Sequence, residues 1–537
     1  MAELTETTIA APAVSPGPWK PKFNPWLIAV VVAMAAFMEV LDTSIANVAL
    51  PHMAGNLGAS NDESTWVLTS YLVSNAIVLP ISGWLAGLFG RKRFFILCIF
   101  LFTLSSMLCG AAPTLGMLIL FRVLQGVGGG GLQPMAQAIL ADTFPPHQRG
   151  LAFAVYGITA VMAPTIGPTL GGWITDNYTW RWIFYINLPV GLLAMFLAYR
   201  MVEDPPYTKR MPGAAVRVDY IGIALLSLGI GALQILLDKG QEDDWFGSHF
   251  ILTLAWIAVV CLVSLVVWEW RHKDPIIDVR LFKYFSFASA NLMMFILGVI
   301  LFSSLVMMPQ FLQTLMGYTA QSSGMVLSAS GVLLLFEMPV VGQLTTKIAA
   351  KYIVAFGWLL LAIAMYYSTV RMDLLISFRS AMWLRVAQSS GLGFLFVPIS
   401  LIAYSDIPPE KGNSVSGMVN FMRNIGSSVG TSMVTTVLAR RAQFHQSMLA
   451  SHTTSFDPAF QNQVAGLSRQ LVHSGISAAD AQTHAYGMIY QGMQAQAQTL
   501  AYIDTYLLLA IGASIMFLLS FIVRKNNPGA GGGIVAE

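Results

Sequence analysis

The sequence predicts an all-α integral membrane protein with fourteen transmembrane helices. Hydrophobic residues make up 56% of the 537-residue chain and charged residues only 10%, whereas a soluble protein carries about 25% charged residues. The mean hydropathy is +0.66. Apolar runs of about 20 residues, the length that crosses a bilayer as a helix, recur along almost the whole chain.

The predicted spans begin at Trp26, after a polar, proline-containing segment that lacks the short apolar core of a signal peptide. Several spans contain Pro or Gly, which membrane helices tolerate where neighbouring helices satisfy the backbone. The predicted spans are residues 26–47, 65–86, 94–112, 115–140, 151–173, 182–201, 219–237, 250–270, 286–311, 322–346, 352–370, 380–404, 413–439 and 501–523.

We expect two pseudo-symmetric six-helix bundles with two extra helices between them. Residues 83–92 and 342–351 form a weak repeat, since each run starts with Gly, has Leu third and ends with Lys. Repeated halves are common in secondary transporters. The expected parts are a cytoplasmic N-tail (1–25), an N-terminal bundle (26–201), a linker with two additional transmembrane helices (202–284), a C-terminal bundle (285–524) and a cytoplasmic C-tail (525–537).

The distribution of positive charge predicts the orientation in the membrane. Most of the 29 Lys and Arg residues lie in the N-tail, in the even-numbered loops and in the C-tail. Cytoplasmic loops carry such an excess. We therefore expect a multi-pass membrane protein with both termini in the cytoplasm.

One predicted outer loop, residues 441–499, is much longer than a connection requires. It is polar and rich in Gln, and the stretch 461–498 contains few Gly or Pro and is compatible with helix. Two interpretations remain open, a solvated loop and a docking surface for a periplasmic partner.

Charged residues inside spans are informative because each costs roughly 2.5–3.5 kcal/mol at the centre of a membrane helix. Glu39 and Asp42 lie three residues apart, on one face of the first span. Two neighbouring carboxylates in a low dielectric are not easily both ionised, so one of them suits a proton carrier. Arg122, in the fourth span, stays charged and requires an anionic or carbonyl partner. We hypothesise that protonation of Asp42 loosens a pair with Arg122; the alternative is that the acids only cap or pair with a neighbouring helix.

Other polar residues in the spans have less specific interpretations. Glu337 either attracts cationic substrates and lines a cavity or has a structural role beside Pro339. Asn47, Gln125 and Gln133 are assigned with Glu337 to the substrate cavity. Arg385 and Arg423 are interpreted as packing or gating residues.

The sequence contains no pattern typical of an enzyme or an ATP-driven pump. There is no GxxxxGK[ST] and no HExxH, and neither a metal site nor a Ser/His/Asp set is recognisable. The run 126–131 matches GxGxxG, but it lies in an apolar span, where small residues allow close helix contact. We therefore expect no catalytic residues, no metal and no cofactor, and no nucleic-acid partner, with the energy supplied by a proton gradient.

Several motifs resemble those of the fourteen-span drug:proton antiporters of the major facilitator superfamily. The run Leu41-Asp-Thr-Ser-Ile-Ala-Asn-Val-Ala-Leu-Pro51 resembles the signature of their first helix, and Arg122 with Gln125 and Gly126 resembles their fourth-helix motif. The run 157–172 resembles the antiporter motif of the fifth helix, and 180–191 is typical of the fourteen-span branch. The resemblance covers nearly the whole chain.

This resemblance implies the major facilitator fold and proton-coupled export of hydrophobic toxic compounds and antibiotics. It also implies a tripartite system with a periplasmic adaptor of the EmrA type and an outer-membrane channel of the TolC type. The proton-coupling residues would be Asp42 and Arg122. Glu39, which matches no family motif, is added to them on the physical argument alone. The motifs that accompany conformational change would be Gly83, Gly90, Arg91 and Lys92 after the second span, and Gly167, Pro168, Gly171 and Gly172 in the fifth.

One motif departs from the family pattern, because Gly87 stands where an acidic residue is usual. A charge relay through that loop is therefore in doubt. A proton-coupled importer or exporter of a specific metabolite on the same fold is the main alternative function. A membrane receptor would need a signalling domain and a membrane enzyme a nucleophile or metal set, and neither is recognisable.

Overall fold

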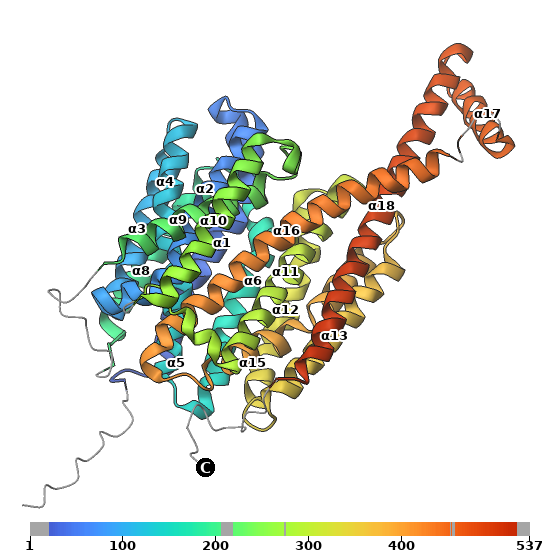
Figure 1. Cartoon of the computed structure of the whole chain (residues 1–537). Helices are drawn as coiled ribbons and strands as arrows, with labels where there is room; N and C mark the ends of the chain where they lie inside the picture. The colour runs from blue at the N-terminus through green and yellow to red at the C-terminus, as the bar shows by residue number, and fades with distance from the viewer. Residues whose placement is uncertain (1–20, 206–217, 273–274, 452, 454–456, 524–537) are drawn as a thin grey trace, which may run out of the picture.

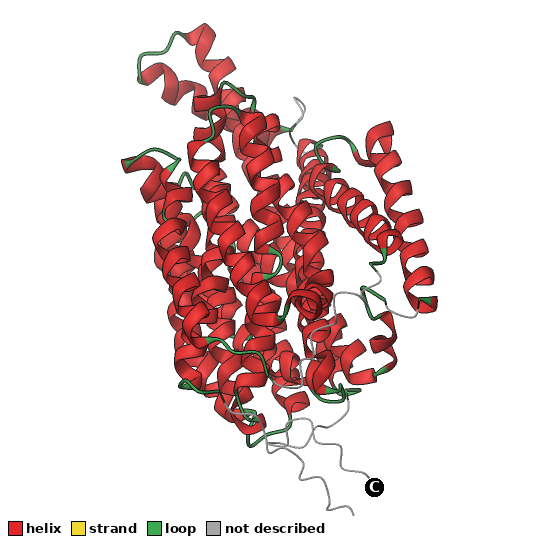
Figure 2. Ribbon diagram, turned by 90° about the vertical axis from the view of Figure 1, so that its left-hand side faces the viewer, coloured by secondary structure: helices red, strands yellow, loops and turns green. Residues whose placement is uncertain are grey.

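The computed structural model describes residues 21–205, 218–272, 275–451, 453 and 457–523. Every regular element in these ranges is a helix, which confirms the all-α prediction (Figure 2). Most of the expected N-tail and all of the expected C-tail lie outside the described residues.

The helices follow the predicted spans closely. In the first half they are α1 (Pro25–Leu57), α2 (Asn61–Phe89), α3 (Arg91–Ala111), α4 (Leu115–Gly129), α5 (Leu132–Thr143), α6 (Arg149–Asn177), α7 (Trp182–Tyr185) and α8 (Asn187–Met201). Between the halves lie α9 (Tyr220–Lys239) and α10 (His249–Arg271). The second half contains α11 (Phe285–Thr314), α12 (Ala320–Leu344), α13 (Ala350–Arg371), α14 (Phe378–Ser389), α15 (Leu392–Tyr404), α16 (Gly412–Ala450), α17 (Pro458–His473) and α18 (Ala478–Ser520).

Thirteen helices of the described chain are long and apolar enough to cross a membrane, so the predicted count of fourteen is not confirmed. The predicted span 413–439 forms the first part of α16, which is not among the thirteen. Its composition explains this, because α16 carries polar residues such as Asn420, Arg423 and Ser427. Asn420 and Arg423 are buried and Ser427 is half-buried, so these residues face the interior of the protein rather than lipid.

Two predicted spans are interrupted at small residues. The span 115–140 is α4 followed by α5, with the break at Gly130 and Gly131, and the span 380–404 is α14 followed by α15, with the break at Ser390 and Gly391. Glycine favours such interruptions because it lacks the side chain that stabilises helical backbone.

The most extensive packing between the two halves is that of α6 with α12 and of α2 with α16. Small residues allow these helices to approach: a Cβ atom on Gly150 of α6 would lie 2.7 Å from the carbonyl oxygen of Gly342 on α12. Buried apolar side chains form one continuous core through both halves and a smaller cluster around Ile45, Leu118 and Phe184. The extra helix α9 packs on α2 and α16, while α10 packs on α9 and leaves many apolar side chains exposed, as a lipid-facing helix does.

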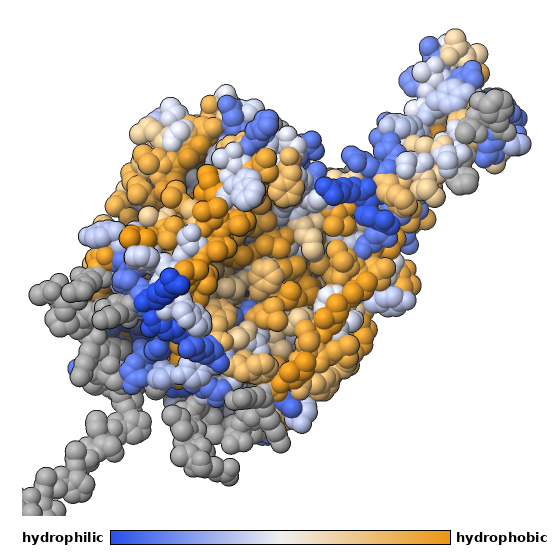
Figure 3. Space-filling view, viewed as in Figure 1, coloured by the Kyte–Doolittle hydropathy of each residue, from blue (hydrophilic) through white to orange (hydrophobic). Residues whose placement is uncertain are grey.

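The long segment 441–499 is mainly helical. Helices α16 and α18 extend beyond the bundle, and α17 joins them in a protrusion at the upper right of Figure 1. The end of α18, drawn in red, lies on the opposite side of the molecule (Figure 1). The face of the helix bundle seen in Figure 3 is largely apolar, whereas polar side chains gather on the protrusion.

Candidate functional site

A buried ion pair joins the first and fourth predicted spans. An Nη atom of Arg122 on α4 donates to Oδ2 of Asp42 on α1 at 2.5 Å, and both side chains are almost completely buried. A charge buried without a partner is strongly destabilising, so each of these groups requires the other in this environment. The structure therefore brings together the two residues that sequence reasoning treated as a candidate pair.

Neighbouring helices complete the surroundings of this pair. Gln125 of α4 and Asn187 of α8 donate to Oδ1 of Asp42 at 3.0 and 2.6 Å. The Nε atom of Arg122 donates to the backbone oxygen of Val67 at 3.0 Å, and its guanidinium lies 4.3 Å from the ring centroid of Tyr71. Side chains from α4 and α8 therefore converge on this one carboxylate of α1.

Glu39 lies in a second buried network, one helical turn from Asp42. The Tyr71 hydroxyl donates to its Oε1 at 2.8 Å, the Asn75 side chain donates to the same atom at 3.1 Å, and Gln133 of α5 donates to Oε2. Tyr71 thus contacts Glu39 with its hydroxyl and Arg122 with its ring face. Tyr71 therefore lies between the Glu39 network and the pair of Asp42 and Arg122, and contacts both.

Gly129, the last residue of α4, allows this arrangement. A Cβ atom on Gly129 would lie 2.6 Å from the Tyr71 hydroxyl and 3.3 Å from Cγ of Glu39. Any larger residue at this position would displace the network. The glycine run 126–131 therefore provides close approach between helices, as the sequence predicted.

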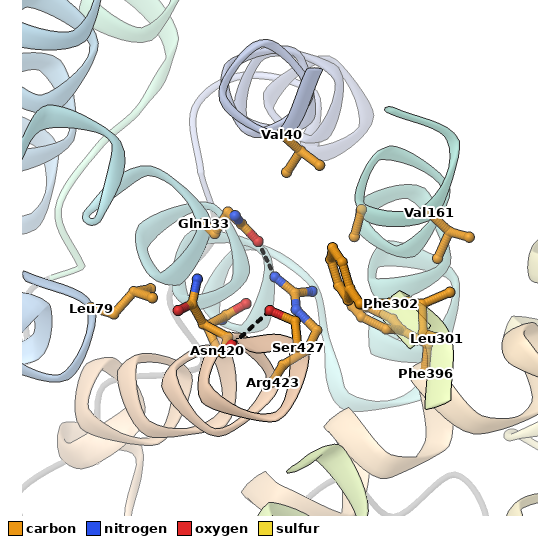
Figure 4. A pocket seen from close by; sticks show the side chains of 12 residues that line it. Val40, Leu79, Gln133, Val161, Leu301, Phe302, Phe396, Asn420, Arg423 and Ser427 are labelled. Atoms are coloured by element: carbon orange, nitrogen blue, oxygen red, sulfur yellow. Dashed lines mark hydrogen bonds between the residues drawn. The ribbon is translucent and has the colours of Figure 1, made fainter. Parts of the chain in front are cut away.

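Gln133, which donates to Glu39, also lines a pocket between the two halves. Gln133 accepts a hydrogen bond from the Arg423 guanidinium of α16 and one from Tyr156 of α6 at 3.3 Å. The single proton of the Tyr156 hydroxyl is shared with the side-chain oxygen of Asn420 on α16, which lies nearer at 2.8 Å. Figure 4 shows the side chains of Gln133 and Arg423 pointing toward each other and joined by their hydrogen bond. The lining residues are Val40, Leu79, Gln133, Ala160, Val161, Leu301, Phe302, Phe396, Asn420, Arg423, Asn424 and Ser427.

This pocket is largely apolar, with a polar strip on one side. Apolar side chains come from α1, α2, α6, α11 and α15, and the polar groups come from α5 and α16. Such a lining suits a small molecule that buries an apolar body and presents a few polar atoms.

The residues assigned to a substrate cavity from sequence do not all meet here. Gln133 lines the pocket, whereas Gln125 binds Asp42 and Arg122. Asn47 is an exposed residue of α1. Glu337 of α12 is not among the lining residues; its Oε1 accepts from the backbone N–H of Gly393 at 3.1 Å, at the start of α15.

The glycine and proline residues of α6 pack against α1. A Cβ atom on Gly167 would lie 2.3 Å from the Ser44 hydroxyl, and one on Gly171 would lie 3.1 Å from a side-chain atom of Ile45. Gly172 is also buried. The carbonyl of Pro164, which lacks a helical donor because Pro168 has no N–H, accepts from the Ser44 hydroxyl at 3.1 Å.

The motif after the second span lies where the halves meet. A Cβ atom on Gly83 would lie 2.9 Å from the backbone nitrogen of Ser414 on α16, so α2 and α16 are in close contact there. Gly90 has a φ of 83°, which favours glycine. Arg91 is buried and forms an ion pair with Asp142 at the end of α5. The backbone N–H of Lys92 donates to Asp204 at 2.8 Å.

Sequence reasoning missed several members of these networks, namely Tyr71, Asn75, Tyr156, Asn187 and Asn420. A signal existed for some of them. Tyr71 and Asn75 are four residues apart in an apolar span and therefore share a helix face. Asn187 lies within the run 180–191 that resembles a family motif.

The chain is similar to known transporters over most of its length. The family model described as Major Facilitator Superfamily matches residues 32–431. The Multidrug export protein EmrB of Haemophilus influenzae is 38% identical over 460 residues, which are 86% of this chain and 88% of the relative. The Multidrug export protein EmrB of Escherichia coli (strain K12) is 35% identical over 510 residues, or 94% of this chain and 96% of the relative.

The same fold occurs in a solved structure of a proton:xylose symporter, XylE, with a TM-score of 0.58. The match covers 93% of this chain and 96% of the symporter at 12% sequence identity, so this likeness concerns the fold alone.

Proposed function

The chain belongs to the Major Facilitator Superfamily, and from this premise we propose that it is a multidrug efflux transporter that exchanges hydrophobic drugs for protons. Members of this family are transporters, in agreement with the expectation that the chain is not an enzyme. Efflux of several drugs is the function that the multidrug export proteins among its relatives support. Proton coupling rests on the buried pair of Asp42 and Arg122.

Asp42 is the proposed proton-binding residue. Protonation would remove the negative charge that Arg122 requires, and the buried guanidinium would then need other acceptors. A change in the packing of α1 against α4 and α8 would satisfy this need. The pair therefore links proton binding to the relative positions of helices.

Glu39 and Gln133 connect this event to the drug pocket. Gln133 donates to Glu39 and accepts from Arg423, so one amide side chain joins an acid of the first half to a cation of the second. A change in the charge of Glu39 would alter the position of Gln133 and hence the pocket. Binding of the drug and binding of the proton would then both affect the contact between Gln133 and Arg423, which joins the two halves.

The drug would bind in the pocket between the halves. Its apolar side chains suit hydrophobic compounds, and Arg423, Asn420 and Gln133 offer polar contacts. Alternating access would close this pocket on one side of the membrane while opening it on the other. The proton gradient would supply the energy: about 2.3 kcal/mol per charge per 100 mV, and about 1.4 kcal/mol per pH unit.

We further propose that the protein lies in the bacterial inner membrane with both termini in the cytoplasm. In this orientation the protrusion formed by α16, α17 and α18 would lie in the periplasm (Figure 1). It presents exposed apolar side chains, including Phe444, Met448, Met488 and Tyr490. A periplasmic adaptor of the EmrA type, continuing to an outer-membrane channel of the TolC type, would dock there.

Drug-induced proton movement in proteoliposomes with an imposed pH gradient tests the proposal. Wild type is compared with Asp42→Asn, which keeps the size of the side chain but has no charge to lose. Proton flux that appears with drug and is absent from the variant would support antiport with Asp42 as the coupling site. Flux that persists in the variant would assign the proton to another residue, with Glu39 tested next. No flux with any hydrophobic drug would favour a transporter of a specific metabolite.

A further inference from the structure

The second half of the protein contains a close counterpart of the Arg122 site, built around Arg385. Arg385 is eight residues beyond Ser377, and Arg122 is eight residues beyond Thr114. Ser377 and Thr114 are the N-caps of α14 and α4, and each accepts a hydrogen bond from the backbone N–H three residues later. Both arginines are followed by Gln at the third position, in Arg122-Val-Leu-Gln125 and Arg385-Val-Ala-Gln388.

The hydrogen bonds of the two sites also correspond. An Nη atom of Arg385 donates to Oε1 of Gln388 at 3.2 Å, as Arg122 does to Gln125 at 2.9 Å. The same Nη atom of Arg385 donates to the Ser304 hydroxyl of α11 at 3.0 Å. Gln388 in turn donates to the Ser368 hydroxyl of α13 at 2.9 Å.

Ser304 occupies the place that Asp42 occupies in the first half. Val40 of α1 and Phe302 of α11 both line the pocket between the halves, and Asp42 and Ser304 each come two residues later. Each arginine therefore donates to the first helix of its own half, at the residue two positions after one that lines the pocket. The first half supplies a carboxylate there, and the second half supplies a hydroxyl.

Arg385 consequently has no acidic partner in the described residues. Its side chain is 1% exposed, and its Nε and one Nη atom have no hydrogen-bond acceptor there. The one buried acid among the described residues of 285–523 is Glu337, whose carboxylate contacts Gly393 instead. Guanidinium remains charged in proteins, so a neutral acceptor set leaves this buried charge uncompensated.

We propose that Arg385 binds a small monovalent inorganic anion, with chloride as the physiological ligand class. The two donors of Arg385 without acceptors would contact the ion, and a single negative charge would balance the single guanidinium. The site is too enclosed for a drug, because Ser304, Arg385 and Gln388 are each at most 2% exposed and none of them lines the pocket. The anion would replace, in the second half, the charge that Asp42 provides in the first.

Thermal unfolding of the purified full-length protein in detergent tests this inference without any measurement of transport. Sodium chloride is titrated against sodium gluconate at constant ionic strength. Wild type is expected to show a saturable rise in Tm of about 2 °C or more with chloride. Absence of a chloride effect in wild type would overturn the proposal.

The variants Ser304→Asp and Arg385→Met locate the ion, and Ser304→Ala is the matched control. Ser304→Asp supplies a permanent carboxylate, so its Tm should no longer depend on chloride. Ser304→Ala removes the hydroxyl without adding charge and should retain the chloride effect. Arg385→Met replaces the buried charge by an apolar side chain of similar length and should lose the effect while still folding. A chloride effect as large in Ser304→Asp or Arg385→Met as in wild type would contradict binding at Arg385.

Discussion

The hydroxyl of Ser44 on α1 donates at 3.1 Å to the backbone oxygen of Pro164 on α6. This oxygen lies four residues before Pro168 and so has no N–H donor within its own helix. A side chain of one helix therefore completes the backbone of another, in the glycine- and proline-rich part of α6. The contact allows α6 to keep a proline inside the membrane without an unsatisfied carbonyl.

Replacing Ser44 by Ala should destabilise the protein by about 1 kcal/mol, because the Pro164 oxygen would lose its donor in a buried environment. For a protein of this size we expect a fall in Tm of about 1–2 °C. Thr159→Ala is the control, since the Thr159 hydroxyl donates only within its own helix, to the Tyr156 oxygen. Equal Tm values for the two variants would show that the contact between α1 and α6 contributes nothing.

Glu39→Gln should slow drug transport by about tenfold or more. Tyr71, Asn75 and Gln133 all donate to the Glu39 carboxylate, and an amide group would turn its NH₂ toward one of these donors. Drug efflux from proteoliposomes at a fixed pH gradient measures the effect. Glu39→Asp keeps two acceptor oxygens and should be impaired less. A Glu39→Gln variant with wild-type rates would exclude this network from the transport cycle.

Gly129→Ala should also reduce transport by about tenfold, since the new methyl group would collide with the Tyr71 hydroxyl and displace the network around Glu39. Gly116→Ala is a matched control on the same helix, because a Cβ atom there would meet nothing within 4 Å. Both variants are compared by drug efflux at equal amounts of protein in the membrane. Similar losses in the two variants would indicate a general effect on α4 rather than a specific contact.

The protrusion should be needed for association with an adaptor. Deleting residues 455–495 removes α17 and the first part of α18, and should abolish co-purification of an adaptor of the EmrA type. Met448→Asp and Met488→Asp, which place charge on exposed apolar positions of the protrusion, should reduce the adaptor recovered severalfold. Leu375→Asp is the control, because Leu375 is exposed and apolar but lies in the turn between α13 and α14. Unchanged recovery after the deletion would count against docking at the protrusion.

Part of the candidate site could be predicted from the sequence. Charged residues are rare in membrane helices and need partners, so Glu39, Asp42 and Arg122 were recognisable without a structure. Their partners were harder to find. Gln125 was assigned to the substrate cavity, yet it donates to Asp42, and Asn187, from a distant helix, donates to the same oxygen. Which polar residues meet depends on the rotation of each helix about its axis, which an apolar run does not specify.

The sequence by itself determined the class of the protein: a helical membrane protein of the Major Facilitator Superfamily, with spans that match the helices closely. Hydrophobic length and local motifs are properties of single helices, and they can be read residue by residue. Only the tertiary structure decided that Tyr71 lies between Glu39 and Arg122, that Gln133 links Glu39 to Arg423, and that Ser304 faces Arg385 where Asp42 faces Arg122. These contacts join residues far apart in the chain, and they arise because buried polar groups must be satisfied by whichever side chains the packed helices bring within reach.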